Sequence, residues 1–228
     1  DYYLLGGMQL AEGKGFTEPI LWNYLDDPDG LPHPSHGYWM PLTSILAAIS
    51  LRLTPFDGFA GARIIFLILA GFIPPVTAWL AWGLFPGRGE RARAGMATLS
   101  GVLAAFPGFY FSFLTVPDAF AVYMLLGAGF LGLASSSAKG KWVGLGLMAG
   151  AMHLSRADGF LWLGVAMVAV LLEYGMWKRD WRLEIRDWVL GIGYCVGGYL
   201  LVMGPWLARN LSAFGTLLAR AGDMRFGY

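Results

Sequence analysis

Two aspartates could act as an acid, a base or a metal ligand: Asp1, before a short amphipathic segment, and Asp118, where one long apolar run ends and the next begins. Asp1 precedes one apolar segment, and Asp118 lies directly before another, at the end of the sequence TVPD. An ionisable group at a membrane boundary is costly and is therefore a functional candidate. Both positions are also typical of a helix N-cap, in which the carboxylate accepts a backbone N–H. The sequence leaves both interpretations open.

Three histidines form a second group of candidates. His33 and His36 are three residues apart in a Pro-rich loop, and such a pair could bind a divalent metal together with a carboxylate. No regular helix is predicted to hold them, so two solvated loop histidines are the favoured alternative. His153 lies near the end of an apolar run, and we predict for it a hydrogen-bonded packing role.

Arginine supplies a third group, Arg63, Arg156 and Arg209, each at the end of an apolar run. The planar guanidinium matches the geometry of phosphate oxygens. Three such side chains on one face could therefore hold a lipid phosphate. The alternative is that each arginine extends to the lipid headgroups without a specific ligand.

The composition indicates the solvent in which this chemistry would take place. The 228 residues are 57% hydrophobic and 14% charged, whereas soluble domains carry about 25% charged residues. This excludes an ordinary cytosolic globular protein and predicts an integral membrane protein in contact with the lipid bilayer. The net charge of +1 argues against a nucleic-acid partner. The single cysteine, Cys195, permits no internal disulfide.

Uncharged runs and basic loops predict an all-α chain with six membrane spans. A span needs about 20 apolar residues, and basic loops mark the cytoplasmic side. Basic residues gather in the gaps 88–93, 139–141 and 178–186. If all three gaps are cytoplasmic, an even number of spans separates each pair. The predicted spans are 61–84, 95–114, 118–136, 142–156, 159–176 and 188–207. Glycines predicted to form close helix contacts are Gly146, Gly150, Gly191, Gly193, Gly197 and Gly198.

This topology brings side chains that are distant in sequence to one outer membrane boundary, including Asp118 and Arg156. Residues 3–12 and 40–54 are each expected to form a short amphipathic helix at the membrane interface. The predicted parts are an extracytoplasmic loop with these two juxtamembrane helices (1–60), the six-span bundle (61–207) and the start of the next extracytoplasmic segment (208–228).

Five segments of the chain carry a resemblance to a known family. They are DYYLLGGMQLAEGKGF, HGYWMPLTSILAAISLRL followed by GARIIF, TVPDAFAVYMLL, MHLSRADGFLWL and GPWLARNLSAFGT. In this order they resemble GT-C membrane glycosyltransferases of the protein O-mannosyltransferase and aminoarabinose transferase group. The motifs are degenerate, but the resemblance covers nearly the whole chain. It implies a GT-C-type helical bundle without the family's first span. Since the chain also begins with Asp rather than Met, we expect a fragment of a longer protein.

The resemblance implies a hexosyl- or pentosyltransferase that moves a sugar, with inversion, from a polyprenyl-phosphate carrier to a lipid, glycan or protein acceptor. The active face would be the extracytoplasmic side of the plasma (inner) membrane. By position, Asp1 matches the family's first-loop catalytic acid, whose role is general base, and Asp118 matches the second-loop acid. Their roles are exchangeable. Relatives usually place a second acid beside the first, whereas here Asp1 opens the chain. A divalent cation, Mg²⁺ or Mn²⁺, would be held by Asp1, Asp118 and His36, and the lipid phosphate by Arg63, Arg156 and Arg209.

Two other functions stay open. A catalytically silent membrane subunit or lipid-binding relative would share the fold but would not bring Asp1 and Asp118 together in one cavity. A transporter or flippase would need ionisable residues in the middle of its spans. The charges of this sequence gather at the ends of the apolar runs instead, which makes a transporter the less favoured alternative.

Overall fold

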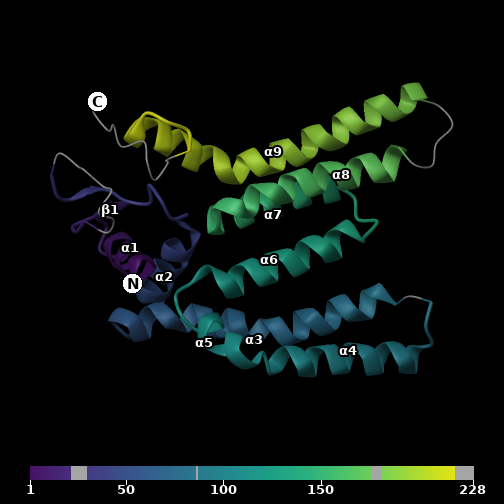
Figure 1. Ribbon diagram of the computed structural model, residues 1–228, viewed down its shortest axis with the longest axis horizontal. Helices are drawn as coiled ribbons and strands as arrows, with labels where there is room; N and C mark the ends of the chain where they lie inside the picture. The colour runs from purple at the N-terminus through teal and green to yellow at the C-terminus, as the bar shows by residue number, and fades with distance from the viewer. Residues whose placement is uncertain (22–29, 86, 176–180, 219–228) are drawn as a thin grey trace. The chain divides into compact units, whose positions relative to one another are not determined.

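The computed structural model describes residues 1–21, 30–85, 87–175 and 181–218 (Figure 1). Regular structure in these residues is nearly all helical, with one short two-stranded ribbon. Three helical segments are long and apolar enough to cross a membrane, namely Gly58–Leu84, Ala157–Tyr174 and Ile185–Phe214. The prediction of a nearly all-α chain is confirmed, and the three segments are compatible with a multi-pass membrane protein.

Helix occupies each of the six predicted spans. The corresponding elements are α3 (Gly58–Leu84), α4 (Glu90–Ala105) with η1 (Gly108–Tyr110) and α5 (Phe111–Leu114), α6 (Ala119–Ala134), α7 (Lys141–Ser155), η2 (Ala157–Phe160) with α8 (Leu161–Gly175), and α9 (Trp181–Phe214). The helices α6 and α7 have 16 and 15 residues. Each is about 24 Å long or less at 1.5 Å per residue, whereas the hydrocarbon core of a bilayer measures about 30 Å. Six membrane crossings therefore stay a prediction. The helix α9 extends beyond the predicted 188–207 at both ends.

The second predicted span, 95–114, is not one straight helix. The axis bends by 56° between α4 and the short helices η1 and α5. Pro107 lies in this break and has no backbone N–H to donate. Gly108 follows with a φ of 59°, in the left-handed region that glycine tolerates best. The expectation of a continuous span is therefore corrected to two helices that meet at a Pro-Gly break.

The chain forms two compact units, and each is described by itself. Unit 1 contains residues 1–70, 110–122 and the described residues from Pro205 onward. Its N-terminal elements are α1 (Tyr2–Ala11), β1 (Thr17–Glu18), β2 (His33–Pro34) and α2 (Leu42–Leu53). The helices α1 and α2 occupy the two predicted amphipathic segments. They pack closely, because a Cβ atom on Gly7 would lie 2.7 Å from the Cβ atom of Ala47.

Unit 2 contains residues 71–109 and 123–204. Within it, α7 and α9 approach one another through glycine. A Cβ atom on Gly150 would lie 2.9 Å from the Tyr199 carbonyl oxygen, and one on Gly198 would overlap the Val143 carbonyl oxygen. Such contacts are the glycine-mediated helix packing expected of membrane proteins.

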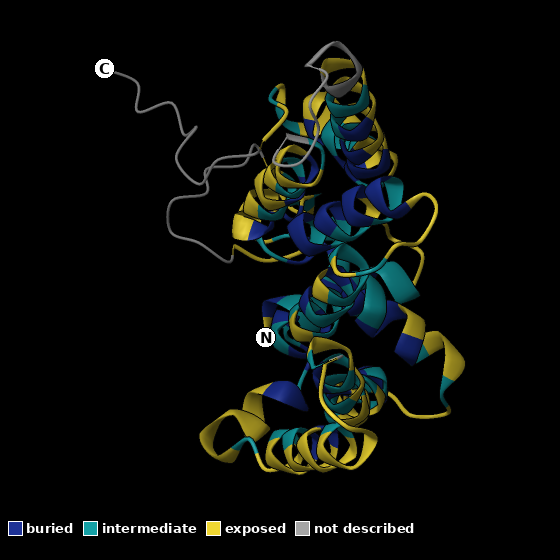
Figure 2. Cartoon of the chain, turned by 90° about the vertical axis from the view of Figure 1, so that its right-hand side faces the viewer, coloured by how far each residue is buried: buried dark blue, intermediate teal, exposed yellow. Residues whose placement is uncertain are grey.

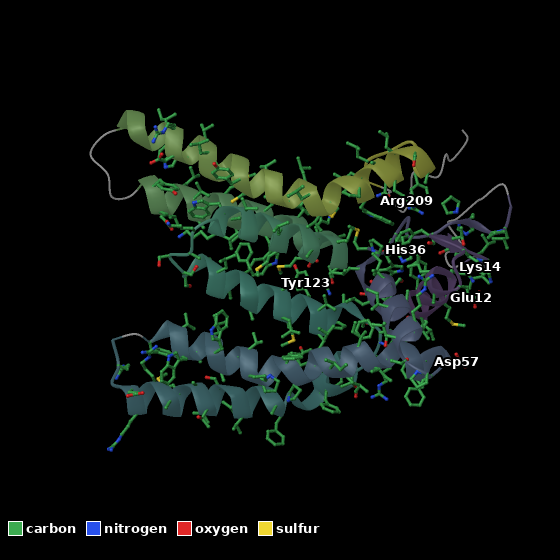
Figure 3. All side chains as sticks on the ribbon, turned by 180° about the vertical axis from the view of Figure 1, so that it is seen from behind. Glu12, Lys14, His36, Asp57, Tyr123 and Arg209 are labelled. Atoms are coloured by element: carbon green, nitrogen blue, oxygen red, sulfur yellow. The ribbon has the colours of Figure 1, made fainter. Side chains whose placement is uncertain are left out.

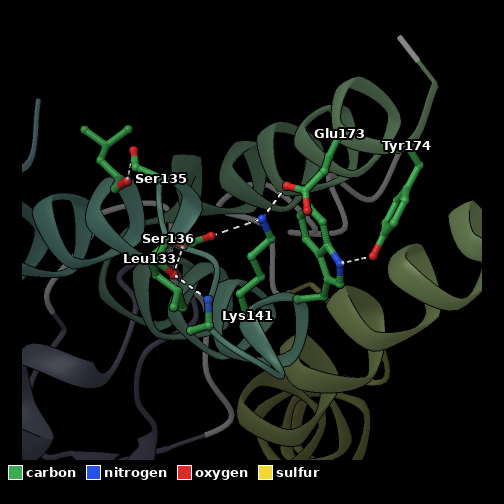
Figure 4. Close-up of polar contacts among 9 residues, drawn as sticks. Leu133, Ser135, Ser136, Lys141, Glu173 and Tyr174 are labelled. Atoms are coloured by element: carbon green, nitrogen blue, oxygen red, sulfur yellow. Dashed lines mark hydrogen bonds and ion pairs between the residues drawn. The ribbon is translucent and has the colours of Figure 1, made fainter. Parts of the chain in front are cut away.

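The α7–α8 hairpin is fixed by polar contacts at the end that holds Lys141 (Figure 4). The Lys141 ammonium donates to the Glu173 carboxylate and, at 3.2 Å, to the Ser136 carbonyl oxygen. Beside it, the Trp142 indole N–H donates to the Tyr174 hydroxyl at 3.1 Å. Hydrogen bonds to charged groups contribute more than those between neutral groups, so these contacts keep α7 and α8 in register.

Many exposed side chains on the long helices are large and apolar. Leu67, Ile68 and Phe72 on α3 are 43%, 54% and 54% exposed, and Figure 2 shows exposed residues along the helices. Apolar surface on this scale is not usual for a protein in water. It is the surface that a lipid-facing helix requires.

Candidate functional site

Polar and aromatic side chains of unit 1 gather around His36. This residue is 3% exposed, and its φ of 61° is uncommon for a residue other than glycine. Its backbone N–H donates to the Tyr2 hydroxyl at 2.5 Å. The imidazole meets the rings of Tyr2, Phe16 and Trp206 edge to face. The alternative of a solvated loop histidine is therefore wrong for His36, because partners from α1 and α9 bury it.

Hydrogen bonds determine which nitrogen of His36 carries the proton. The Ser44 hydroxyl donates to the Tyr3 carbonyl oxygen at 3.1 Å, so it accepts from His36 Nε2 at 2.9 Å. Nδ1 then accepts from the Ser35 hydroxyl at 2.7 Å. Burial, and after it the positive charge of Arg209, lower the pKa of His36 to about 3. The ring is therefore neutral at pH 7, with its proton on Nε2.

Arg209 of α9 binds the backbone of the residue before β1 and of the residue after β2. Its Nη2 donates to the Ser35 carbonyl oxygen at 2.7 Å and to the Phe16 carbonyl oxygen at 3.2 Å. The guanidinium also lies 4.8 Å from the ring centroids of both Trp206 and Phe214, within range of cation–π attraction. Figure 3 labels Arg209 and His36, both of which belong to unit 1. The arginine expected to bind phosphate thus connects α9 to the N-terminal loop.

Arg63 of α3 makes a similar contact with the turn that contains Asp118. Its Nε donates to the Thr115 carbonyl oxygen at 2.6 Å, and its Nη2 donates to Thr115 Oγ1 at 3.2 Å. Within the turn, the Asp118 N–H donates to the Val116 carbonyl oxygen at 2.7 Å. Asp118 Oδ1 accepts the backbone N–H of Ala119, the first residue of α6, at 2.5 Å. Arg63 and Asp118 are thus joined through one short turn.

Asp1 lies at the N-terminus of α1 and is exposed, and its Oδ1 accepts the Tyr3 N–H at 3.1 Å. The capping interpretation is therefore confirmed for Asp1. The Asp118 contact differs, because its partner is the N–H of the next residue, Ala119, whereas a cap binds the second or third helical N–H. Asp1 and Asp118 both belong to unit 1, and their chemical roles stay predictions.

The remaining candidate residues have separate partners. His33 Nε2 lies 3.3 Å from Glu18 Oε1, across the β1–β2 ribbon, so His33 and His36 do not share a partner. Arg156 belongs to unit 2, where its Nε lies 3.1 Å from Asp158 Oδ1. His153 Nδ1 lies 2.5 Å from the Tyr199 hydroxyl, which confirms its hydrogen-bonded packing role. Arg63 and Arg209 belong to unit 1 and Arg156 to unit 2, and the convergence of all three on one phosphate stays a prediction.

No group of three His, Cys, Asp or Glu side chains within the described ranges is placed to hold a metal ion. The divalent cation expected from the resemblance stays a prediction. Two residues of the site, Ser44 and Thr115, were not singled out from the sequence. Ser44 is buried in α2, where Thr43 and Ser50 are buried hydroxyl residues too. A buried hydroxyl generally has a partner, but no local pattern marks Ser44 among the three as the partner of His36.

The chain was compared with protein-family models, with curated proteins and with solved structures, and none of the three comparisons found a match.

Proposed function

We propose that this chain is the core of a membrane glycosyltransferase that moves a sugar from a polyprenyl-phosphate carrier to an acceptor on the extracytoplasmic side. One observation carries the proposal. Asp1, Asp118, Arg63 and Arg209, which are far apart in sequence, belong to one compact unit. Carboxylates and guanidinium groups are the side chains that such a transfer requires.

In the proposed reaction the acceptor hydroxyl gives its proton to a carboxylate, for which Asp1 is our first choice. The hydroxyl oxygen attacks the anomeric carbon as the bond from that carbon to the phosphate oxygen breaks, which inverts the configuration. The lipid phosphate departs with negative charge. Arg63 and Arg209 are proposed to stabilise this charge, with Asp118 as second carboxylate or metal ligand. The roles of Asp1 and Asp118 are exchangeable.

The expected metal ligands fit a divalent cation unequally. The carboxylates of Asp1 and Asp118 are oxygen ligands of the kind that Mg²⁺ and Mn²⁺ prefer. His36 already uses Nε2 as a donor and Nδ1 as an acceptor, so it would have to leave Ser35 before it could bind a metal. A cation held by the two carboxylates would supply charge neutralisation at the lipid phosphate.

A second candidate function is a catalytically silent, lipid-binding membrane subunit. The observation that favours it is that the candidate residues already serve the fold. Asp1 and Asp118 accept backbone N–H groups at helix N-termini, and Arg63 and Arg209 donate to backbone carbonyls. Side chains kept only for these contacts would give the same structure without turnover.

The two functions differ in an assay of lipid-linked sugar consumption. Membranes that contain the protein would be supplied with polyprenyl phosphates carrying labelled hexoses or pentoses, with membranes lacking the protein as control. The glycosyltransferase proposal expects protein-dependent release of polyprenyl phosphate and a product of inverted anomeric configuration. Absence of turnover with every carrier-linked sugar, by a protein that is folded and membrane-inserted, would favour the silent subunit. Retention of configuration would contradict the proposed single displacement.

A further inference from the structure

We propose that Arg63 is a positioning residue that holds the Asp118 turn in place, an inference that rests on the proposed function. The contact joins two segments that are distant in sequence, the first turns of α3 and the connection between α5 and α6. Arg63 donates to two oxygens of one residue, the carbonyl and the hydroxyl of Thr115. Asp118 follows three residues later.

The turn between Thr115 and Asp118 has little freedom once Thr115 is fixed. Thr115 is 4% exposed, and its hydroxyl also donates to the Phe111 carbonyl oxygen at 3.4 Å. Pro117 is fully buried, and its ring restricts the backbone. The Asp118 N–H closes the turn on the Val116 carbonyl oxygen. Displacement of Thr115 would therefore move the backbone that carries the Asp118 carboxylate.

Arginine is required for this contact by its geometry. Nε and Nη2 diverge from one planar group and reach both oxygens of Thr115 together, which the single ammonium of lysine does not reproduce. The Arg63 guanidinium also lies 5.9 Å from the Phe59 ring centroid, on the same helix. The donors directed at Thr115 are occupied before any substrate arrives. We therefore assign Arg63 to the geometry of the turn in place of the phosphate contact suggested above, which leaves Arg209 as the proposed phosphate ligand in unit 1.

The position of the turn can be measured without catalysis. In a Cys195→Ser background, which removes the native thiol, Val116→Cys places a reactive thiol in the turn. We expect Arg63→Gln to raise the rate at which a water-soluble maleimide labels that thiol by roughly tenfold. The loss of a charge-assisted hydrogen bond should shift the equilibrium between the closed and the exposed turn by a factor of that order. Thr115→Val removes the hydroxyl but keeps the carbonyl oxygen that accepts from Arg63 Nε, so it should raise the rate less.

Arg52→Gln is the matched control. Arg52 makes the same kind of contact in the same unit, from Nε to the Ala11 carbonyl oxygen at 3.1 Å and from Nη2 to the Leu10 carbonyl oxygen at 3.1 Å. It binds the end of α1 and should leave the labelling rate unchanged. An equal rate in the Arg63→Gln variant and its parent would overturn the proposal. Equal increases in both arginine variants would overturn it too, because they would indicate general loosening of unit 1.

Kinetics separate positioning from phosphate binding. A positioning role predicts that Arg63→Gln lowers kcat about tenfold while KM for the lipid-linked donor is unchanged, and that Arg63→Lys does not restore kcat. A raised KM with an unchanged labelling rate would identify a phosphate ligand and overturn the proposal. If the wild type consumes no donor but Arg63→Gln still exposes the turn, the glycosyltransferase proposal fails while the structural role of Arg63 stands.

Discussion

Acid should destabilise unit 1 through His36. The pKa of this histidine is about 3 in the folded protein and 6.5 in the ordinary case, because burial and the charge of Arg209 disfavour the imidazolium. The unfolded chain therefore binds a proton first as the pH falls. Stability is retained above pH 6.5, declines as the pH falls below that value, and continues to decline until the folded form is protonated near pH 3.

The size of the effect follows from the distance between the working pH and 6.5. Each pH unit below the unfolded pKa costs about 1.4 kcal/mol while the folded ring stays neutral. Between pH 7.5 and pH 5.0, His36 alone should remove about 2 kcal/mol from the free energy of unfolding. Tyr2 and Arg209 also face the ring.

The assay is denaturant unfolding in detergent micelles at pH 7.5 and 5.0, followed by tryptophan fluorescence. Trp206 reports on the site, since its ring centroid lies 6.2 Å from that of His36. His36→Asn is the informative variant because asparagine tolerates positive φ and does not titrate here. Wild type should lose about 2 kcal/mol more than His36→Asn between the two pH values. Equal losses in the two proteins would refute the neutral, buried state of His36.

Two further predictions concern packing. Gly198→Ala should lower the free energy of unfolding by about 1–3 kcal/mol, because the new Cβ would overlap the Val143 carbonyl oxygen. A Cβ atom on its neighbour Gly197 would meet no atom of another described segment within 4 Å, so Gly197→Ala should be neutral or stabilising in the same thermal unfolding assay. Arg209→Gln should cost about 1.5–3 kcal/mol through the loss of charge-assisted bonds to Ser35 and Phe16, and an unchanged melting temperature would contradict this.

The helices were largely predictable because their signal is local. Uncharged apolar runs located four of the six helical segments, the even-number rule for basic loops added 142–156 and 159–176, and the amphipathic pattern located α1 and α2. The break at Pro107-Gly108 also had a local signal, since proline removes a donor and glycine accepts positive φ, but the prediction gave priority to the length of the apolar run. The far ends of α9 were missed because charged residues at a helix end do not stop the helix.

The candidate site was less predictable because its contacts join distant segments. His36 is buried by rings of Tyr2 and Trp206, at opposite ends of the chain, and no local pattern distinguishes it from a solvated loop histidine. The same limit applies to glycine. The sequence treats Gly197 and Gly198 alike, yet only Gly198 meets α7, because the helix phase relative to its neighbour decides which one is at the contact.

Asp118→Asn tests most directly whether the carboxylates of unit 1 carry out sugar transfer. The asparagine side-chain oxygen can still accept the Ala119 N–H, while the substitution removes the charge. Asp57→Asn is the matched control, because Asp57 is exposed in the same unit and has no role in the proposed reaction. In membranes supplied with the labelled donor that the wild type consumes, we expect Asp118→Asn to lower kcat about 100-fold and Asp57→Asn to leave it unchanged. Equal turnover by wild type and Asp118→Asn would contradict the account.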